Sequence, residues 1–251
     1  MLIDTHCHLF ESDYDNLDEV IKRMPGIMIT AGIGDESNQE VLKMIDKYDN
    51  IYGVLGIHPE EIEKISDDSF AIIEANINNP KIVGIGEIGL DYYWVRDNKE
   101  KQKELFEKQI FLARKYHKPI VVHNRDAHGD ILDIIKRNPD ISYVLHCFSG
   151  SVEMARELLK YNVMFGIGGV STFDKYDKLK EVIKEIGLEY LLLETDSPYL
   201  TPVPYRGKKN EPAYTDIIAA EIAKIKGITK EEVIQRTCEN AIREFDLPIQ
   251  L

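Results

Sequence analysis

The sequence predicts an α/β protein folded as a (β/α)8 barrel, in which parallel strands alternate with helices and close on themselves. Short apolar runs alternate along the chain with amphipathic runs of helical periodicity, which is typical of a parallel sheet covered by helices. Eight such apolar runs can be distinguished, which is enough strands for closure. The length of 251 residues is also typical of this fold, and we expect one domain over residues 1–251.

The predicted strands are short hydrophobic runs, as expected for strands that are buried on both faces. In chain order they cover residues 2–6, 26–31, 51–57, 82–87, 120–123, 143–147, 164–167 and 190–194. Apolar residues recur with helical spacing among Lys and Glu in the intervening segments. These predict helices over residues 99–116, 152–161, 178–186 and 215–226. A last helix is expected to begin at Thr229, because Thr229 and Glu232 have capping-box spacing.

Composition limits the possible partners and the compartment. The net charge of −13 argues against the broad basic surface that binds duplex DNA, so an anionic substrate would need local binding. No apolar run approaches the roughly 18 residues of a membrane span, and we expect no signal peptide. Three cysteines without a CxxC pair argue against a disulfide framework. We therefore expect a cytoplasmic protein with no membrane association and no obligate protein partner.

Metal-type ligands lie at the carboxyl ends of the predicted strands, where a barrel of this kind builds its active site. The six candidates are His6, His8, Glu87, His123, His146 and Asp196. His6 and His8 point the same way, because residues two apart share a face of a strand. Closure places the eighth strand beside the first, so Asp196 should share one divalent ion with these two histidines. His123 and His146, on neighbouring strands, should share a second ion.

Glu87 ends the fourth strand, between the two groups of ligands, and we expect it to bridge the two ions. Imidazole and carboxylate ligands suit zinc or manganese, and a carboxylate-rich site with open positions also accepts magnesium. Two divalent metal ions in one site are typical of hydrolysis. Any one of the histidines could instead be a core residue with satisfied hydrogen bonds, but six ligand-type groups at one end of one sheet favour a metal centre.

Three further side chains are candidates for substrate binding. His58 ends the third strand beside the predicted site, and Arg125 lies two residues after His123. Arg206 is on the loop after the eighth strand, where barrels often bind phosphate. We predict that these residues contact substrate phosphate. The alternatives are a structural role for His58 and surface salt bridges for the two arginines.

Three consecutive aromatic residues, Tyr92, Tyr93 and Trp94, follow the predicted fourth strand. Aromatic rings beside a phosphate site can stack the bases of a single nucleic-acid strand. They can equally pack a loop against the barrel, and the sequence favours neither interpretation.

Six segments carry a resemblance to a known family: DTHCHL at 4–9, GIHP at 56–59, GIGEIGLD at 84–91, HNRDA at 123–127, HCFSG at 146–150 and ETDSP at 194–198. Together they resemble the TatD family of metal-dependent deoxyribonucleases, within the amidohydrolase superfamily. The resemblance covers almost the whole chain and ends with residues 204–212. It implies a (β/α)8 barrel with two divalent ions and the six ligands given above. The family often has arginine at the position of Lys209. Lysine keeps the positive charge, but it cannot form the two parallel hydrogen bonds that a guanidinium group makes with a phosphate.

The predicted function is a divalent-metal-dependent deoxyribonuclease that cleaves phosphodiester bonds at single-stranded DNA ends through a hydroxide bridging the metals. Asp196 and Glu87 are the predicted catalytic residues. Asp196 would bind one ion, accept the proton of the water and return it to the leaving oxygen; alternatively, it is only a ligand. One competing function is an amidohydrolase-type deacylase or esterase, for example on aminoacyl-tRNA. Another is a non-catalytic nucleic-acid-binding protein, against which the acidic charge and the intact ligand set argue.

Overall fold

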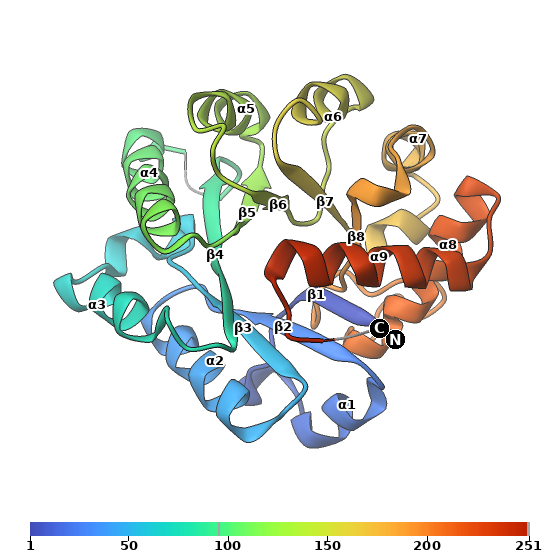
Figure 1. The fold of residues 1–251 in the computed structure, drawn as a ribbon, viewed down its shortest axis with the longest axis horizontal. Coiled ribbons are helices and arrows are strands. Elements are labelled where there is room, and N and C mark those ends of the chain that lie inside the picture. The colour runs from blue at the N-terminus through green and yellow to red at the C-terminus, as the bar shows by residue number, and fades with distance from the viewer. Residues whose placement is uncertain (95, 250–251) are drawn as a thin grey trace.

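Eight parallel strands form one sheet that curls into a nearly closed barrel, and the helices form a ring outside it (Figure 1). The computed structural model describes residues 1–94 and 96–249. Strands pair in the order of the sequence, each in parallel with the next. They are β1 (Ile3–Cys7), β2 (Ile27–Ala31), β3 (Ile51–Leu55), β4 (Ile82–Asp91), β5 (Ile120–Arg125), β6 (Tyr143–Leu145), β7 (Val163–Ile167) and β8 (Leu191–Leu193).

Hydrogen bonds between the ends of β8 and β1 close the ring. The Thr5 hydroxyl donates to the carbonyl oxygen of Leu193 at 2.9 Å, and the Asp196 N–H donates to the carbonyl oxygen of His6 at 2.9 Å. The His8 N–H donates to the carbonyl oxygen of Ser197 at 2.7 Å. These bonds confirm the predicted neighbourhood of the first and last strands, and with it the (β/α)8 fold.

Nine α-helices connect or follow the strands within residues 1–94 and 96–249. They are α1 (Leu17–Arg23), α2 (Asp35–Lys47), α3 (Asp67–Asn76), α4 (Lys99–Tyr116), α5 (His128–Arg137), α6 (Val152–Leu158), α7 (Asp177–Glu185), α8 (Thr215–Lys226) and α9 (Lys230–Phe245). Thr229 caps α9 as predicted, because its hydroxyl accepts the Glu232 N–H at 3.2 Å. In the described part of the chain, no helix combines the length and apolar character needed to cross a bilayer.

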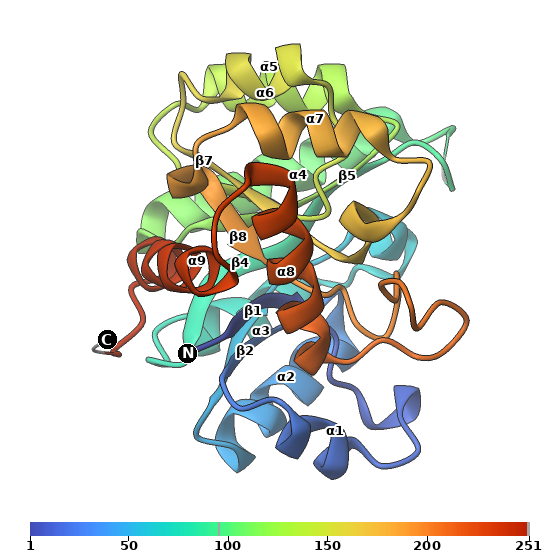
Figure 2. The same cartoon turned by 90° about the vertical axis from the view of Figure 1, so that its right-hand side faces the viewer.

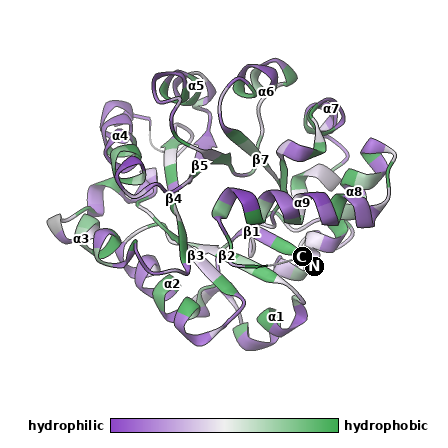
Figure 3. Ribbon diagram, viewed as in Figure 1, coloured by the Kyte–Doolittle hydropathy of each residue, from purple (hydrophilic) through white to green (hydrophobic). Residues whose placement is uncertain are grey.

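The core has two layers, and their arrangement leaves one end of the barrel for the site. Each strand sends an apolar side chain into the barrel interior: Ile3, Ile29, Tyr52, Val83, Val121, Val144, Met164 and Leu192. Cys238, Ala241 and Phe245 of α9 pack on this inner cluster and cover the amino-terminal end of the barrel. A second, larger cluster lies between the strands and the surrounding helices. Figure 3 shows apolar residues in the strands and a mixture of apolar and polar residues on the helices. The segments after β4 and β8 extend on the side opposite to the termini (Figure 2).

Strand ends differ from the predicted ones where the site begins. β4 continues four residues past Glu87, and Asp91 at its end is in register with Arg125 of β5. β6 stops at Leu145, two residues earlier than predicted, and Cys147 has a φ of 44° that turns the chain out of the strand. The helix predicted over 152–161 ends at Leu158. The carboxyl ends of the strands are therefore less regular than their apolar runs.

Candidate metal centre

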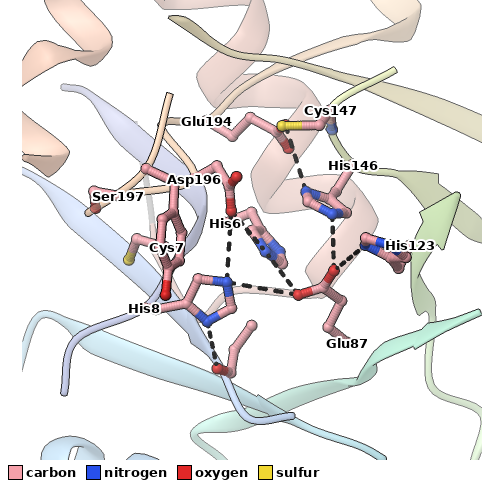
Figure 4. A network of polar contacts seen from close by, with 12 residues as sticks. His6, Cys7, His8, Glu87, His123, His146, Cys147, Glu194, Asp196 and Ser197 are labelled. Atoms are coloured by element: carbon pink, nitrogen blue, oxygen red, sulfur yellow. Dashed lines mark hydrogen bonds and ion pairs between the residues drawn. The ribbon is translucent and has the colours of Figure 1, made fainter. Parts of the chain in front are cut away.

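Glu87 lies at the centre of a group of buried and partly buried imidazoles at the carboxyl end of the barrel (Figure 4). Its Oε2 atom is 3.4 Å from His6 Nε2 and 3.6 Å from His8 Nε2. Its Oε1 atom is 2.7 Å from His123 Nδ1 and 2.9 Å from His146 Nε2. The two oxygens of one carboxylate thus face two different pairs of histidines, which is the geometry that a bridging ligand requires.

Asp196 faces the first of these pairs. Its Oδ1 atom is 3.5 Å from His8 Nε2 and 3.7 Å from His6 Nε2. A φ of 55° at Asp196 turns the chain after β8, so that its side chain points back towards β1. All six predicted ligands therefore meet at one end of the barrel. Sets of ligand atoms within 4.8 Å of one another include His6–His8–Glu87, His6–His146–Asp196 and His58–Glu87–His123.

The donor atoms fit divalent metal ions. His6 is fully buried, and neither of its ring nitrogens has a hydrogen-bond partner among the described residues. Burial lowers the pKa of His6 to about 4, so its imidazole is neutral and can bind a metal. Burial opposes ionisation of Glu87, but the neighbouring His146 and His123 outweigh it and hold the pKa of Glu87 well below its ordinary value. A neutral imidazole and an ionised carboxylate are the forms in which these groups bind metals.

Hydrogen bonds outside the centre orient two of the imidazoles. His8 Nδ1 lies 3.1 Å from the carbonyl oxygen of Ala31, which can only accept, so Nδ1 carries a proton and Nε2 is the nitrogen that faces Glu87 and Asp196. His123 Nε2 lies 3.0 Å from Asp91 Oδ2, and its Nδ1 faces Glu87. Carboxylates and carbonyls commonly hold metal-binding histidines in this way. Our sequence analysis did not assign Asp91 a role, although Asp91 has the same strand parity as Glu87.

The contact with Asp91 predicts that replacing it weakens metal binding without unfolding the protein. In Asp91→Ala, the His123 ring loses its acceptor, and we expect metal affinity to fall about 10- to 100-fold. Isothermal titration with Mn²⁺ would measure the change. Asp140→Ala, which removes an exposed partner of Arg114, is the control. Unchanged affinity in Asp91→Ala would contradict the orienting role.

Two more buried acids hold the strand ends below the ligands. Asp4 Oδ1 accepts the Thr195 N–H at 2.9 Å, and its Oδ2 accepts the Thr195 hydroxyl at 2.6 Å. Glu194 Oε1 accepts the Cys147 N–H at 2.5 Å and lies 3.8 Å from His146 Nδ1. Burial raises the pKa of Glu194 to about 7. These carboxylates tie the backbone after β6 and β8 to neighbouring strands and thereby position His146 and Asp196.

A glycine makes room for one of these acids. A Cβ at Gly166 on β7 would lie 2.1 Å from Oε2 of Glu194, well inside contact distance. Only glycine therefore lets Glu194 occupy its place between β7 and His146. The sequence shows Gly166 within an apolar run, but not the side chain that fills the space beside it.

His58 also lies in the centre, with its Nε2 atom 3.6 Å from Glu87 Oε1. Its Nδ1 accepts the Glu60 N–H at 3.2 Å. Burial lowers the pKa of His58 to about 3, so the ring is neutral and its single proton is on Nε2. His58 therefore directs an N–H donor into the centre, and this favours contact with an anion over metal ligation.

Comparison with known proteins agrees with this geometry. The family described as TatD related DNase matches residues 3–246 of the chain. The chain belongs to the TatD family. It is 42% identical over 252 residues to the metal-dependent hydrolase YabD of Bacillus subtilis, covering 98% of this chain and 99% of that protein. It is 38% identical over 251 residues to the metal-dependent hydrolase MJ1582 of Methanocaldococcus jannaschii, covering 97% and 96% respectively.

A solved structure supports the same assignment. The crystal structure of YJJV, a TatD homolog from Escherichia coli K12, superposes with a TM-score of 0.89 at 31% identity over 98% of both chains. The chain is therefore a metal-dependent hydrolase of the TatD family. Its buried cluster of histidine and carboxylate side chains is where metal ions could bind.

The two arginines predicted to bind substrate, Arg125 and Arg206, lie over aromatic rings in this TatD chain. Arg125 Cζ is 4.0 Å from the centroid of the Tyr93 ring, and Arg206 Cζ is 4.1 Å from that of Phe173. Arg206 Nη1 also donates to the Thr201 carbonyl oxygen at 3.1 Å. Neither arginine forms a salt bridge with any residue within 1–94 or 96–249, so the surface salt-bridge alternative does not hold there.

The remaining side chains near the site separate into packed and exposed ones. The Tyr92 hydroxyl donates to Asp130 Oδ2 at 2.6 Å and the Tyr92 ring is buried, so Tyr92 holds the segment after β4 against α5. Tyr93 and Trp94 are exposed. Lys209 Nζ donates to the carbonyl oxygen of Asp13, which shows that this lysine binds the segment after β1.

Proposed function

We propose that the chain is a divalent-metal-dependent deoxyribonuclease that hydrolyses phosphodiester bonds at the ends of single-stranded DNA. The observation that carries this proposal is the position of Glu87, whose two oxygens face two sets of histidines. The description of the matching family as a DNase supports nucleic acid as the substrate. Arg125 and Arg206 form no ion pair within residues 1–94 and 96–249, and they supply positive charge in an otherwise acidic protein.

Six residues would hold the metal ions. His6, His8 and Asp196 would hold one ion, His123 and His146 the other, with Glu87 between them. When bound, a pair of divalent ions acidifies water and neutralises charge on a phosphoryl group. Zinc, manganese and magnesium are all compatible with this mixture of imidazole and carboxylate donors.

Asp196 would act as the general base. Its side chain is 13% exposed, more than those of His6 and Glu87, so a water molecule can reach it. Burial opposes its ionisation, but His8 and His146 hold the pKa of Asp196 below its ordinary value, so the carboxylate can accept a proton. It would take the proton of the attacking water and return it to the leaving oxygen of the sugar.

Three side chains would bind the phosphates. The Nε2–H of His58 is directed at the centre and would donate to a phosphate oxygen, in place of its long contact with Glu87. Arg125 and Arg206 would contact phosphates on either side, with their guanidinium groups supported by Tyr93 and Phe173. Local cations of this kind suit a protein whose net charge of −13 would repel a nucleic acid at longer range.

Digestion of end-labelled oligonucleotides tests the proposed function. Single-stranded DNA should be shortened from its ends in Mg²⁺ or Mn²⁺, faster than a blunt duplex of the same sequence, and EDTA should stop the reaction. Asp196→Asn, prepared in parallel, controls for contaminating nucleases. Absence of DNA products with metal demonstrably bound, together with hydrolysis of aminoacyl esters, would replace the nuclease with the acyl hydrolase.

A further inference from the structure

Two large aromatic side chains stand exposed at the end of β4, on the side of the barrel that carries the metal centre. Trp94 is 62% exposed and Tyr93 is 42% exposed. Their rings meet edge to face, with centroids 4.7 Å apart. Arg125 lies over both, 4.0 Å from the Tyr93 centroid and 5.3 Å from the Trp94 centroid. These three side chains, Tyr93, Trp94 and Arg125, are called the aromatic platform below.

The aromatic platform is tied to the metal centre through one carboxylate. Asp91 Oδ1 accepts the backbone N–H groups of Tyr93 and Trp94, each at 2.9 Å. The other oxygen, Oδ2, lies 3.0 Å from His123 Nε2. The same side chain therefore orients a proposed metal ligand and fixes the start of the aromatic segment. Register between Asp91 and Arg125 brings the third member of the platform to the same place.

Packing does not account for the exposed rings. Tyr92 already anchors this segment, since its ring is buried, its hydroxyl is bonded to Asp130, and Lys99 Nζ lies 4.3 Å from its ring centroid. The next two rings add little to that anchor, because 42% of the surface of Tyr93 and 62% of that of Trp94 remain exposed to solvent. Exposed aromatic faces beside a polar centre are typical of ligand-binding sites.

We propose that the aromatic platform stacks an unpaired nucleobase of the strand whose phosphate lies at the metal centre. This inference rests on the proposed function and adds the means by which single strands are selected. Bases of an unpaired end can offer their π faces to Trp94 and Tyr93, whereas bases inside a duplex are already stacked on their neighbours. Stacking also gives affinity without a positive surface field, as a chain of net charge −13 requires.

Fluorescence offers a direct test, because Trp94 is the single tryptophan of the chain. The full-length Asp196→Asn variant, saturated with Mg²⁺, is titrated with a short single-stranded deoxyoligonucleotide, so that binding at the metal centre is observed while cleavage is slowed. We expect quenching of the Trp94 emission by the intact strand, and little quenching by a strand of the same length with abasic sites at its ends. Equal quenching by the abasic strand, or no quenching by either, would overturn the proposal.

Steady-state kinetics with metal form the second arm. Trp94→Ala should raise KM for single-stranded DNA about 5- to 100-fold with kcat nearly unchanged, whereas Trp94→Phe should keep most of the affinity. Phe111→Ala, which removes a 65% exposed ring on α4, is the control and should have no effect. Normal KM in Trp94→Ala would also overturn the stacking role.

The fluorescence titration and the kinetics together distinguish an error in the stacking proposal from an error in the proposed nuclease function. Quenching by the intact strand without any DNA cleavage would keep the stacking site and reject the nuclease. Cleavage that is unaffected in Trp94→Ala, without quenching, would keep the nuclease and reject the stacking site.

Discussion

Replacing Glu87 by glutamine is expected to remove hydrolase activity and metal binding together. Glutamine keeps the size of the side chain but supplies neither the negative charge nor the two equivalent oxygens that face the two pairs of histidines. We expect the metal content of Glu87→Gln to fall and kcat/KM to drop on the order of 10³-fold or more. Elemental analysis and kinetics at matched metal concentration would measure both quantities.

A matched control shows that the effect comes from the position of the carboxylate. Glu61→Gln changes a glutamate in the segment that follows His58, where it pairs with Lys64 at the surface. This variant should bind metal and turn over substrate as the unmodified protein does. Near-normal metal content in Glu87→Gln, with less than about a tenfold loss of activity, would be incompatible with a bridging ligand.

Replacing Asp196 by asparagine is expected to lower kcat about 10²- to 10⁴-fold while leaving KM nearly unchanged. The asparagine carbonyl oxygen can still face His6 and His8, but the amide cannot accept the proton of the attacking water. Saturating Mn²⁺ should therefore restore metal occupancy in Asp196→Asn without restoring kcat. If excess metal restored both, Asp196 would be a ligand and not the base.

The sequence could predict most of the centre because its ligands obey strand alternation. His6 on β1 and His8 just after it are two residues apart, and closure of the barrel brings Asp196 next to them. Their meeting therefore follows from the parity and order of the strands. Glu87 and His123 lie on the neighbouring strands β4 and β5, and they also meet as expected. Because the backbone of these strands is regular, the relative positions of these ligands can be predicted from the sequence alone.

Other parts of the site could not be predicted because they depend on irregular backbone or on distant contacts. Asp91 shares the parity of Glu87, but Gly89 between them obscures the continuation of β4, and the sequence therefore predicts a strand that ends at Glu87. Glu194 reaches the Cys147 N–H because Gly166 lacks a side chain, and this contact joins three strands. Interactions of this kind follow from the packed fold and leave no periodic signal.

The aromatic segment shows the same limit. The sequence shows three consecutive aromatic residues at positions 92–94, but it does not show which of the three rings are buried and which are exposed. The difference in exposure follows from hydrogen bonds. The Tyr92 hydroxyl bonds to Asp130 and its ring is buried, whereas the bonds of the next two backbone N–H groups to Asp91 leave their rings directed outward. Arg125 completes the arrangement from the neighbouring strand.

Anomalous diffraction from crystals of the protein loaded with Mn²⁺ or Zn²⁺ would locate the metal ions directly. We predict two peaks, one among Glu87 Oε2, His6, His8 and Asp196, and one among Glu87 Oε1, His123 and His146. Glu87 should lie between the peaks and contact both. A loaded crystal with no peak beside Glu87, or with peaks only at surface carboxylates, would contradict the two-metal centre.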